Sequence, residues 1–287
     1  METHIKGLVI TTLGVLFIVP DALFVRLIAA DPLTIAFWRN LLSGLAIALW
    51  VFAVHGRSGF RATFAQGPLI WLYCLFMGLT GILFVSAVSL TSVANVVFIL
   101  ASLPVFSAIL SRIFLKETLS RRTSLTIVVV IIGLGVISLG SGMATNGQML
   151  GNLLALCVAI CYATAMTIAR NLRAVSVVPA VPVAYFGAAI LLMPFTDIWQ
   201  VDAASIPLVA IHGSVFIALA TVFLALGPRY LSSPEVGLLI LLESALAPLL
   251  VWAVLGEQPG TMTLVGGAIV LGALFLSNLL MVMKRAA

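Results

Sequence analysis

The sequence predicts an all-α integral membrane protein with ten transmembrane helices built from two inverted five-helix repeats. Three observations lead to this fold class: the composition, the spacing of the apolar runs, and a weak similarity between the two halves. Hydrophobic residues make up 63% of the 287-residue chain and charged residues 8%, against roughly 25% charged residues in an average soluble domain. Because so few charged groups cannot cover a core of this size, we expect lipid to cover it.

Ten apolar runs, bounded by charged, Gly, Pro or polar residues, are long enough for membrane-spanning helices of roughly 20 residues. The runs are 7–27, 33–54, 68–90, 94–115, 124–139, 149–168, 178–198, 206–226, 236–255 and 261–282. The first run could be a cleaved signal peptide, but its apolar stretch is too long, and Asp21 and Arg26 interrupt it. It therefore predicts a retained helix. Residues 1–287 then form a single transmembrane domain with no room for a separate soluble domain.

The basic residues predict the orientation of the chain. With ten spans, twelve basic residues fall on one side: Lys6, Arg57, Arg61, Arg112, Lys116, Arg121, Arg122, Arg170, Arg173, Arg229, Lys284 and Arg285. Only Arg26 falls on the other side, and Arg39 lies within the second span. Since cytoplasmic loops of membrane proteins carry the excess of Lys and Arg, both termini are expected in the cytoplasm.

Several classes of protein are disfavoured by the same residues. The basic residues lie singly or in pairs between apolar runs and do not gather on one face, so they do not predict a nucleic-acid site. Cys74, Cys157 and Cys161 lie inside apolar runs without His or carboxylate partners, which argues against disulfides and metal sites. No HExxH, GxSxG or Walker motif occurs. We expect no enzymatic activity, cofactor, metal or nucleotide.

The chain divides at the polar connection 141–148, with five runs on either side, into repeats 1–143 and 144–287. Because five is an odd number, two such repeats must lie in opposite orientations in the membrane. Inverted repeats of this kind recur in secondary transporters, where the substrate site lies near the midplane between the halves. The alternative is a chance likeness between two apolar stretches.

Matched positions support the repeat. Ile5-Lys6-Gly7 opens the first run as Met149-Leu150-Gly151 opens the sixth, which places Arg26 and Arg170 in register. Phe114-Leu115-Lys116-Glu117 closes the fourth run as Val254-Leu255-Gly256-Glu257 closes the ninth. The turns at Glu117 and Glu257 are therefore expected on opposite faces of the membrane.

Further motifs extend the pattern: Ala36-Phe37-Trp38-Arg39-Asn40 in the second run, Leu90-Thr91-Ser92-Val93-Ala94 leading to Pro104, and Leu255-Gly256-Glu257-Gln258-Pro259 before a Gly-rich last run. Over nearly the whole chain these motifs resemble the EamA branch of the drug/metabolite transporter superfamily, and within it the bacterial aromatic amino-acid exporters of the YddG type. The resemblance implies ten helices, a bacterial inner-membrane location and export of amino acids or other small metabolites. Two positions depart from the family pattern: Lys116 replaces a Gly, and Ser244 replaces a Pro, with Pro248 one turn later.

Four ionisable residues need a reason to lie inside spans, because each costs roughly 2.5 to 3.5 kcal/mol there. Arg39 is a candidate ligand of a substrate carboxylate; its alternative is to reach the interface or to pair with Asp21 or Asp31 as a structural clamp, and its place in the family pattern favours a structural or gating role. Asp21 follows the helix-breaking Pro20 and suits a substrate amine or a proton, or else a hydrated group near the interface. Glu243 is a proton carrier, an amine ligand or a neutral hydrogen-bonded acid. His212 is expected to be a structural donor.

Aromatic side chains complete the predicted cavity, since they would hold an aromatic or branched substrate. Their alternative role is helix packing or lipid contact. The predicted substrate-binding residues are Phe17, Asp21, Phe24, Arg39, Phe76, Thr80, Tyr162, Tyr185 and Glu243. Five glycines are expected at close helix contacts: Gly133, Gly135, Gly266, Gly267 and Gly272.

These observations favour a secondary exporter of small metabolites, with amino acids, aromatic ones included, as the expected substrates. A multidrug, organic-cation or nucleoside exporter of the same fold is the alternative. A membrane-embedded enzyme and a channel are the alternatives from other classes. The expected partners are a small-molecule substrate and the lipid bilayer, with no nucleic acid and no nucleotide, and the oligomeric state does not follow from the sequence.

Overall fold

The computed structural model describes residues 2–116, 121–142, 146–172, 175–226, 230–231 and 233–286. Its helices are α1 (Glu2–Ile18), α2 (Asp21–Leu27), α3 (Pro32–Phe64), α4 (Leu69–Leu90), α5 (Val93–Leu100), α6 (Leu103–Phe114), α7 (Arg121–Gly142), α8 (Asn146–Asn171), α9 (Ala180–Leu192), α10 (Ile206–Ile211), α11 (Ala218–Leu226), α12 (Ser233–Leu255) and α13 (Thr261–Ala286). Short 3₁₀ turns η1 (Met193–Phe195) and η2 (Ala203–Ser205) and a π-helical segment η3 (His212–Ile217) complete them. Residues 117–120, which include the predicted turn at Glu117, lie outside the described residues.

Within the described part of the chain, nine helical stretches are long and apolar enough to cross a membrane. A tenth, shorter apolar stretch covers Ala180–Phe195 and corresponds to the seventh predicted run. Pro179 directly precedes this helix, Pro182 lies in its first turn, and Pro194 lies in the 3₁₀ turn at its end. Because proline disfavours the helix interior, the helix is shorter than the predicted run 178–198. The all-α membrane fold predicted from hydropathy is thus confirmed at the level of nine to ten apolar helices.

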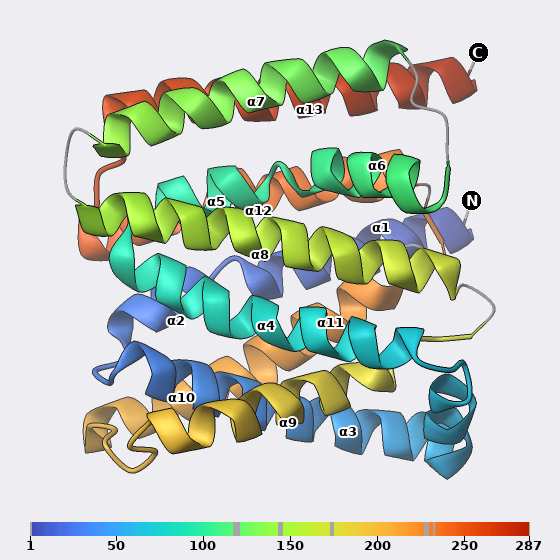
Figure 1. The fold of residues 1–287 in the computed structure, drawn as a ribbon, viewed down its shortest axis with the longest axis vertical. Helices are drawn as coiled ribbons and strands as arrows, with labels where there is room; N and C mark the ends of the chain where they lie inside the picture. Colours follow the sequence, from blue (N-terminus) through green and yellow to red (C-terminus); the bar gives the residue numbers. More distant parts are fainter. Residues whose placement is uncertain are drawn as a thin grey trace.

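The helices run roughly parallel or antiparallel and stack in layers along the long axis of the molecule (Figure 1). α7 and α13 pack together at one end of this axis, and α3 packs on α9 at the other. α8, α4, α1 and α11 lie between them, with α8 on α4 and α1 on α11. Both termini lie at the same end of the helices, hereafter the terminal face, whereas the α4–α5 and α12–α13 connections lie at the opposite face.

Among the described residues, the first, fourth and eighth spanning helices are interrupted within the bundle. The first breaks between Ile18 and Asp21, as predicted from Pro20. The fourth breaks between Leu100 and Leu103, and the eighth contains the π-helical segment, neither of which was predicted. Such breaks leave backbone N–H and C=O groups without a partner inside the helix. In membrane proteins broken helices occur where they line a cavity or are buried in protein, and π-bulges are frequent at functional sites.

α3 continues beyond the predicted end at Val54. It bends at Gly56, whose φ of 58° lies in the left-handed region that glycine adopts without strain. The final part of α3 consequently turns across the end of the bundle (Figure 1).

The core divides into clusters of buried apolar residues. One, which includes Leu23, Val97, Ala247 and Val251, joins α2, α5 and α12. A second joins α3, α4 and α9 around Tyr73, Met77 and Tyr185. Polar residues are nevertheless buried among them, and these define the candidate site.

Candidate functional site

Asp21 lies at the start of α2, where the break at Pro20 turns its side chain into the protein. The residue is 3% exposed, and its carboxylate accepts two hydrogen bonds from Arg39 of α3, from Nε at 3.1 Å and from Nη2 at 2.6 Å. A bidentate pair of this kind is among the strongest side-chain contacts. Of the alternatives for Arg39, the pair with Asp21 is therefore the arrangement found, while Asp31 instead caps α3 by accepting from the amide of Leu33.

His212 completes this buried group from the second half of the chain. Its Nε2 lies 2.7 Å from Asp21 Oδ1, and its ring stacks on Phe24 with centroids 5.1 Å apart. Arg39 lies over the ring of Phe84 at 5.6 Å. The Asp21–Arg39–His212 cluster thus joins α2, α3 and the π-helical segment η3 through charges that are shielded from water.

Two glycines make room for the cluster. A Cβ at Gly81 of α4 would lie 2.5 Å from Asn40 Oδ1 and 3.0 Å from Arg39 Nη1. A Cβ at Gly213 of η3 would lie 3.2 Å from the carbonyl oxygen of Arg39. The helices that carry the cluster therefore approach one another closely only because these positions lack side chains.

The predicted aromatic residues of the first helix pack on the eighth. Phe17 contacts Phe216 and Phe223 with centroids 5.8 and 6.0 Å apart, and Phe24 contacts Phe216 at 4.8 Å. These rings form a continuous wall between α1, α2, η3 and α11 that ends at His212.

Phe76 and Thr80 of α4 are not joined to that wall by any ring contact or side-chain hydrogen bond among the described residues. Phe76 packs, partly buried, against the cluster around Tyr73, and the Thr80 hydroxyl donates to the carbonyl of Met77 one turn earlier. The structure therefore leaves these two residues at the edge of the candidate site.

Tyr162, Tyr185 and Glu243 bring polar groups from α8, α9 and α12 toward the same region. The Tyr185 hydroxyl lies 3.5 Å from Thr221 Oγ1, and its side chain interacts electrostatically with Arg39 and Asp21. Glu243 interacts electrostatically with Asp21 and with Tyr162. Five of the nine predicted residues, from helices of both halves of the chain, are therefore linked by pairwise electrostatic interactions.

Glu243 differs from Asp21 in its partners. No hydrogen bond or ion pair to its carboxyl group occurs among the described residues, and its side chain is only partly buried. Asp21, by contrast, is paired with both Arg39 and His212. Glu243 is accordingly the acidic group in this region that can accept a new ligand without breaking an existing pair.

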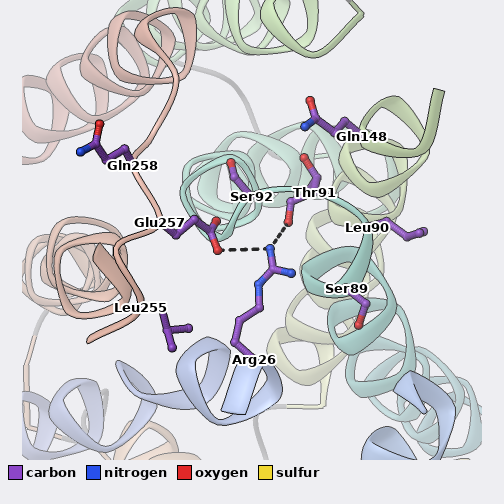
Figure 2. Close-up of a pocket in the computed structure, with 9 residues that line it drawn as sticks. All are labelled: Arg26, Ser89, Leu90, Thr91, Ser92, Gln148, Leu255, Glu257 and Gln258. Atoms are coloured by element: carbon purple, nitrogen blue, oxygen red, sulfur yellow. Dashed lines mark hydrogen bonds and ion pairs between the residues drawn. The ribbon is translucent and has the colours of Figure 1, made fainter. Parts of the chain in front are cut away.

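A separate pocket of about 510 Å³ opens near the face opposite the termini. Figure 2 shows its polar lining, with Arg26 reaching toward Thr91 and Glu257. Arg26 Nη2 donates to the Thr91 carbonyl oxygen at 2.9 Å and lies 3.3 Å from Glu257 Oε2. The pairing of Arg26 with Glu257 was not predicted from the sequence, although a charged residue near a span end was a usable signal.

A buried polar network adjoins this pocket. The Thr91 hydroxyl donates to Asn152 Oδ1 at 2.9 Å, and the Asn95 amide donates to Thr91 Oγ1 at 3.1 Å and to Asn152 Oδ1 at 3.2 Å. The Thr263 hydroxyl donates to Asn95 Oδ1 at 2.5 Å. Because these groups satisfy one another, the network fixes α5 against α8 and α13.

The model of the EamA-like transporter family matches the chain twice, over residues 5–139 and 149–279. No curated protein matches. A solved structure titled "Crystal structure of protein" has the same fold, with a TM-score of 0.68 and 18% identity over 96% of this chain and 98% of that chain. The two family matches cover most of the chain, fall on its two halves and coincide with its multi-pass helical architecture. The chain therefore belongs to the EamA-like transporter family.

Proposed function

We propose that this protein is a secondary transporter that exports amino acids, aromatic ones included, across the bacterial inner membrane, as YddG-type exporters do. In this proposal residues 1–143 and 144–287 form two inverted five-helix repeats that alternate access to a site between them, and both termini are cytoplasmic. The observation that carries the proposal is the convergence of Asp21, Arg39, Tyr185 and Glu243, from both halves, in one interior region lined by aromatic rings.

Matched helix contacts support the repeat. α4 packs on α8 as α11 packs on α1, and α4 packs on α9 as η3 packs on α3. In each comparison, the second pair is obtained from the first when both helices are replaced by their counterparts five spans away.

Matched glycines support the same relation. A Cβ at Gly7 would lie 2.6 Å from Tyr230 Cβ, and one at Gly151 would lie 2.8 Å from Thr91 Cβ. Each glycine thus lies near the start of the first helix of one half. At this position that helix meets the segment before the fourth helix of the other half. Exchange of equivalent contacts between halves is what alternating access requires.

Glu243 is proposed to bind the substrate amine or to carry a proton. It is the acidic group in the site without a partner among the described residues, and Tyr162 and the Phe17–Phe24 wall supply apolar surface for a side chain. A carboxylate that meets an ammonium group in a site with little water gains charge-assisted hydrogen bonds.

Glu243→Gln tests this role. The amide keeps the shape of the side chain but can neither ionise nor carry a proton, and we expect transport to fall roughly 10- to 100-fold, the equivalent of about 1.5 to 3 kcal/mol for hydrogen bonds to charged groups. The measurement is uptake of radiolabelled phenylalanine by proteoliposomes from pH 5.5 to 7.5. The matched control is Glu235→Gln, which removes a carboxylate from the same helix near the terminal face. Equal transport by Glu243→Gln and the parent across this range would assign Glu243 to helix packing.

An exporter of organic cations is the second candidate, and one observation favours it. Glu243 has no hydrogen-bond or ion-pair partner in the part of the chain that the structure describes, whereas the guanidinium of Arg39 is already engaged with Asp21. The site as described therefore offers a partner for an amine more readily than for a carboxylate. Uptake of radiolabelled phenylalanine and of radiolabelled phenethylamine, which lacks the carboxylate, separates the two. Transport of phenethylamine alone would favour the cation exporter, and transport of phenylalanine alone would favour the amino-acid exporter.

A further inference from the structure

The ion pair between Arg26 and Glu257 joins the two halves of the chain. Arg26 lies in the last turn of α2, and Glu257 lies in the connection between α12 and α13. Their side chains are 28% and 26% exposed and 3.3 Å apart. The same Arg26 Nη2 donates to the carbonyl oxygen of Thr91 at the end of α4 (Figure 2).

Glu257 has a second partner at the start of α5. Its Oε1 accepts a hydrogen bond from the amide of Val93 at 2.8 Å, where the unpaired amides of a helix N-terminus favour an anion. One carboxylate of the second half is thus held by a guanidinium and by a helix N-terminus of the first half. The contact fixes the end of α12 against α2 and α5.

Apolar packing continues directly inward from this contact. Leu23 of α2, Val97 of α5 and Val251 of α12 belong to one buried cluster, and Val251 is 1% exposed although it lies one turn before the end of its helix. Water from the pocket beside Arg26 does not reach these side chains. The ion pair and the cluster together join α2, α5 and α12 on the face opposite the termini.

The Arg26–Glu257 and Asp21–Arg39 ion pairs differ in how easily their charged groups can separate. Asp21 and Arg39 have side chains only 5% and 8% exposed, so their separation would leave buried charges without water. Arg26 and Glu257 border an open pocket with polar walls of Ser89, Thr91, Gln148 and Gln258, so water can solvate both groups once they part. Within the described part of the chain, Arg26 also has a buried Nε without a hydrogen-bond partner, which makes this arrangement less favourable than a fully satisfied one.

We infer that the Arg26–Glu257 pair is a reversible latch between the two halves: it closes the protein on the face opposite the termini, and it opens when the site is exposed to that face. The latch follows from the contacts alone, and its opening once per transport cycle rests on the proposed function.

The test measures access to Val251 directly. Val251→Cys is introduced into a protein whose native Cys74, Cys157 and Cys161 are replaced by alanine, and a membrane-impermeant maleimide is added to intact cells and to inside-out vesicles. The latch variants are Glu257→Gln, which still offers an oxygen to the Val93 amide, and Arg26→Gln. We expect each to raise the labelling rate at least about fivefold, the lower end of typical coupling between sites, and from one side of the membrane only.

A double-mutant cycle and a matched control make the result specific. If the two residues act as one latch, Arg26→Gln/Glu257→Gln should label at the rate of the single variants within about twofold, because the second change removes nothing further. Asp202→Asn removes an exposed carboxylate on the same face, from the connection after α9, and should leave labelling unchanged.

Unchanged labelling in both single variants, or equal acceleration by Asp202→Asn, would overturn the latch. So would multiplicative effects in the double variant. Because the readout needs no substrate, accelerated labelling without phenylalanine transport would leave the latch standing and refute the proposed substrate. Transport with unchanged labelling would refute the latch alone.

Discussion

Lys116 adopts a backbone conformation that residues other than glycine rarely adopt. Its φ is 55°, and the matched residue of the second half, Gly256, has a φ of 70°. Both follow the last turn of a helix, where a left-handed residue turns the chain out of the helical path. This explains physically why a glycine is expected at position 116 from the family resemblance.

Exchanging these two residue types should therefore change stability in opposite directions. Lys116→Gly removes the steric strain of the left-handed conformation and should stabilise the protein by up to about 1 kcal/mol. Gly256→Lys introduces the same strain and should destabilise it by about 1 kcal/mol. Thermal unfolding in detergent measures both. A loss of stability in Lys116→Gly would show that the lysine side chain contributes more than its strained backbone costs.

The negative charge of Asp21 is expected to be important for stability, because it neutralises the buried Arg39. Asp21→Asn would leave the Arg39 guanidinium without a counter-charge in a site where it is 7% exposed, and breaking a buried pair from one side costs about 3 to 5 kcal/mol. We expect a large fall in the melting temperature. The double variant Asp21→Asn/Arg39→Gln removes both charges and should recover much of the loss. A single variant as stable as the parent would indicate that Arg39 reaches water in the native protein.

The charged residues inside the spans were predictable from the sequence, but only part of their pairing was. The Asp21–Arg39 pair was one of several alternatives, because the two residues lie close in sequence on adjacent helices. His212, assigned as a structural donor, lies 191 positions from Asp21, and no local pattern indicates which long-range helix pair will bring two such groups together. The π-helical turn that positions His212 likewise has no distinctive sequence signal.

At the scale of helices, glycines determine how closely α7 and α13 approach. A Cβ at Gly266 would lie 2.6 Å from the carbonyl oxygen of Gly133 and 3.0 Å from the amide nitrogen of Ile137. Gly133 and Gly266 are therefore close-packing positions, as predicted. Gly135 and Gly272 are not, since a Cβ at either position would meet nothing within 4 Å. Composition places glycines on a helix, but only the contact face decides which of them are needed.

This contrast gives matched variants on one helix. Gly266→Ala forces backbone apart, because neither the Gly133 carbonyl nor the Ile137 amide can rotate away, and should cost about 1 to 3 kcal/mol. Gly272→Ala meets open space and should be neutral or stabilising by up to about 1 kcal/mol, since alanine favours a helix over glycine. Unfolding midpoints of purified protein in one detergent compare the two. Equal stability of the variants would place the α7–α13 contact farther apart than described.

Helix existence was predictable where helix detail was not. A span is a property of about 20 residues averaged together, so the apolar runs identify the spans despite local irregularities. The extension of α3 past Gly56 and the break between Leu100 and Leu103 depend on a few backbone angles. Such details are set by packing and carry too little sequence signal to be read in advance.

For the whole molecule, the proposed inverted repeat predicts that the turns after the fourth and ninth spans face opposite sides of the membrane. Lys116 ends the fourth span near the terminal face, and Gly260 ends the connection after the ninth span at the opposite face. The twelve basic residues that flank the spans are assigned to the terminal side, which predicts that this side is cytoplasmic. The inverted repeat predicts that the two turns face opposite sides, and the charge distribution predicts which of the two sides is cytoplasmic.

Single cysteines test this orientation in a background without Cys74, Cys157 and Cys161. Lys116→Cys and Gly260→Cys replace exposed residues, and Gln66→Cys, in the α3–α4 connection on the terminal face, is the control for Lys116→Cys. A membrane-impermeant maleimide should label Gly260→Cys in intact cells, and Lys116→Cys and Gln66→Cys only in inside-out vesicles. Labelling of Lys116→Cys and Gly260→Cys from the same side would refute the inverted repeat, because two parallel repeats place their fourth-to-fifth helix turns on one face. Labelling of all three from the sides opposite to those expected would keep the repeat and reverse the orientation, which would mean that the excess of basic residues does not face the cytoplasm.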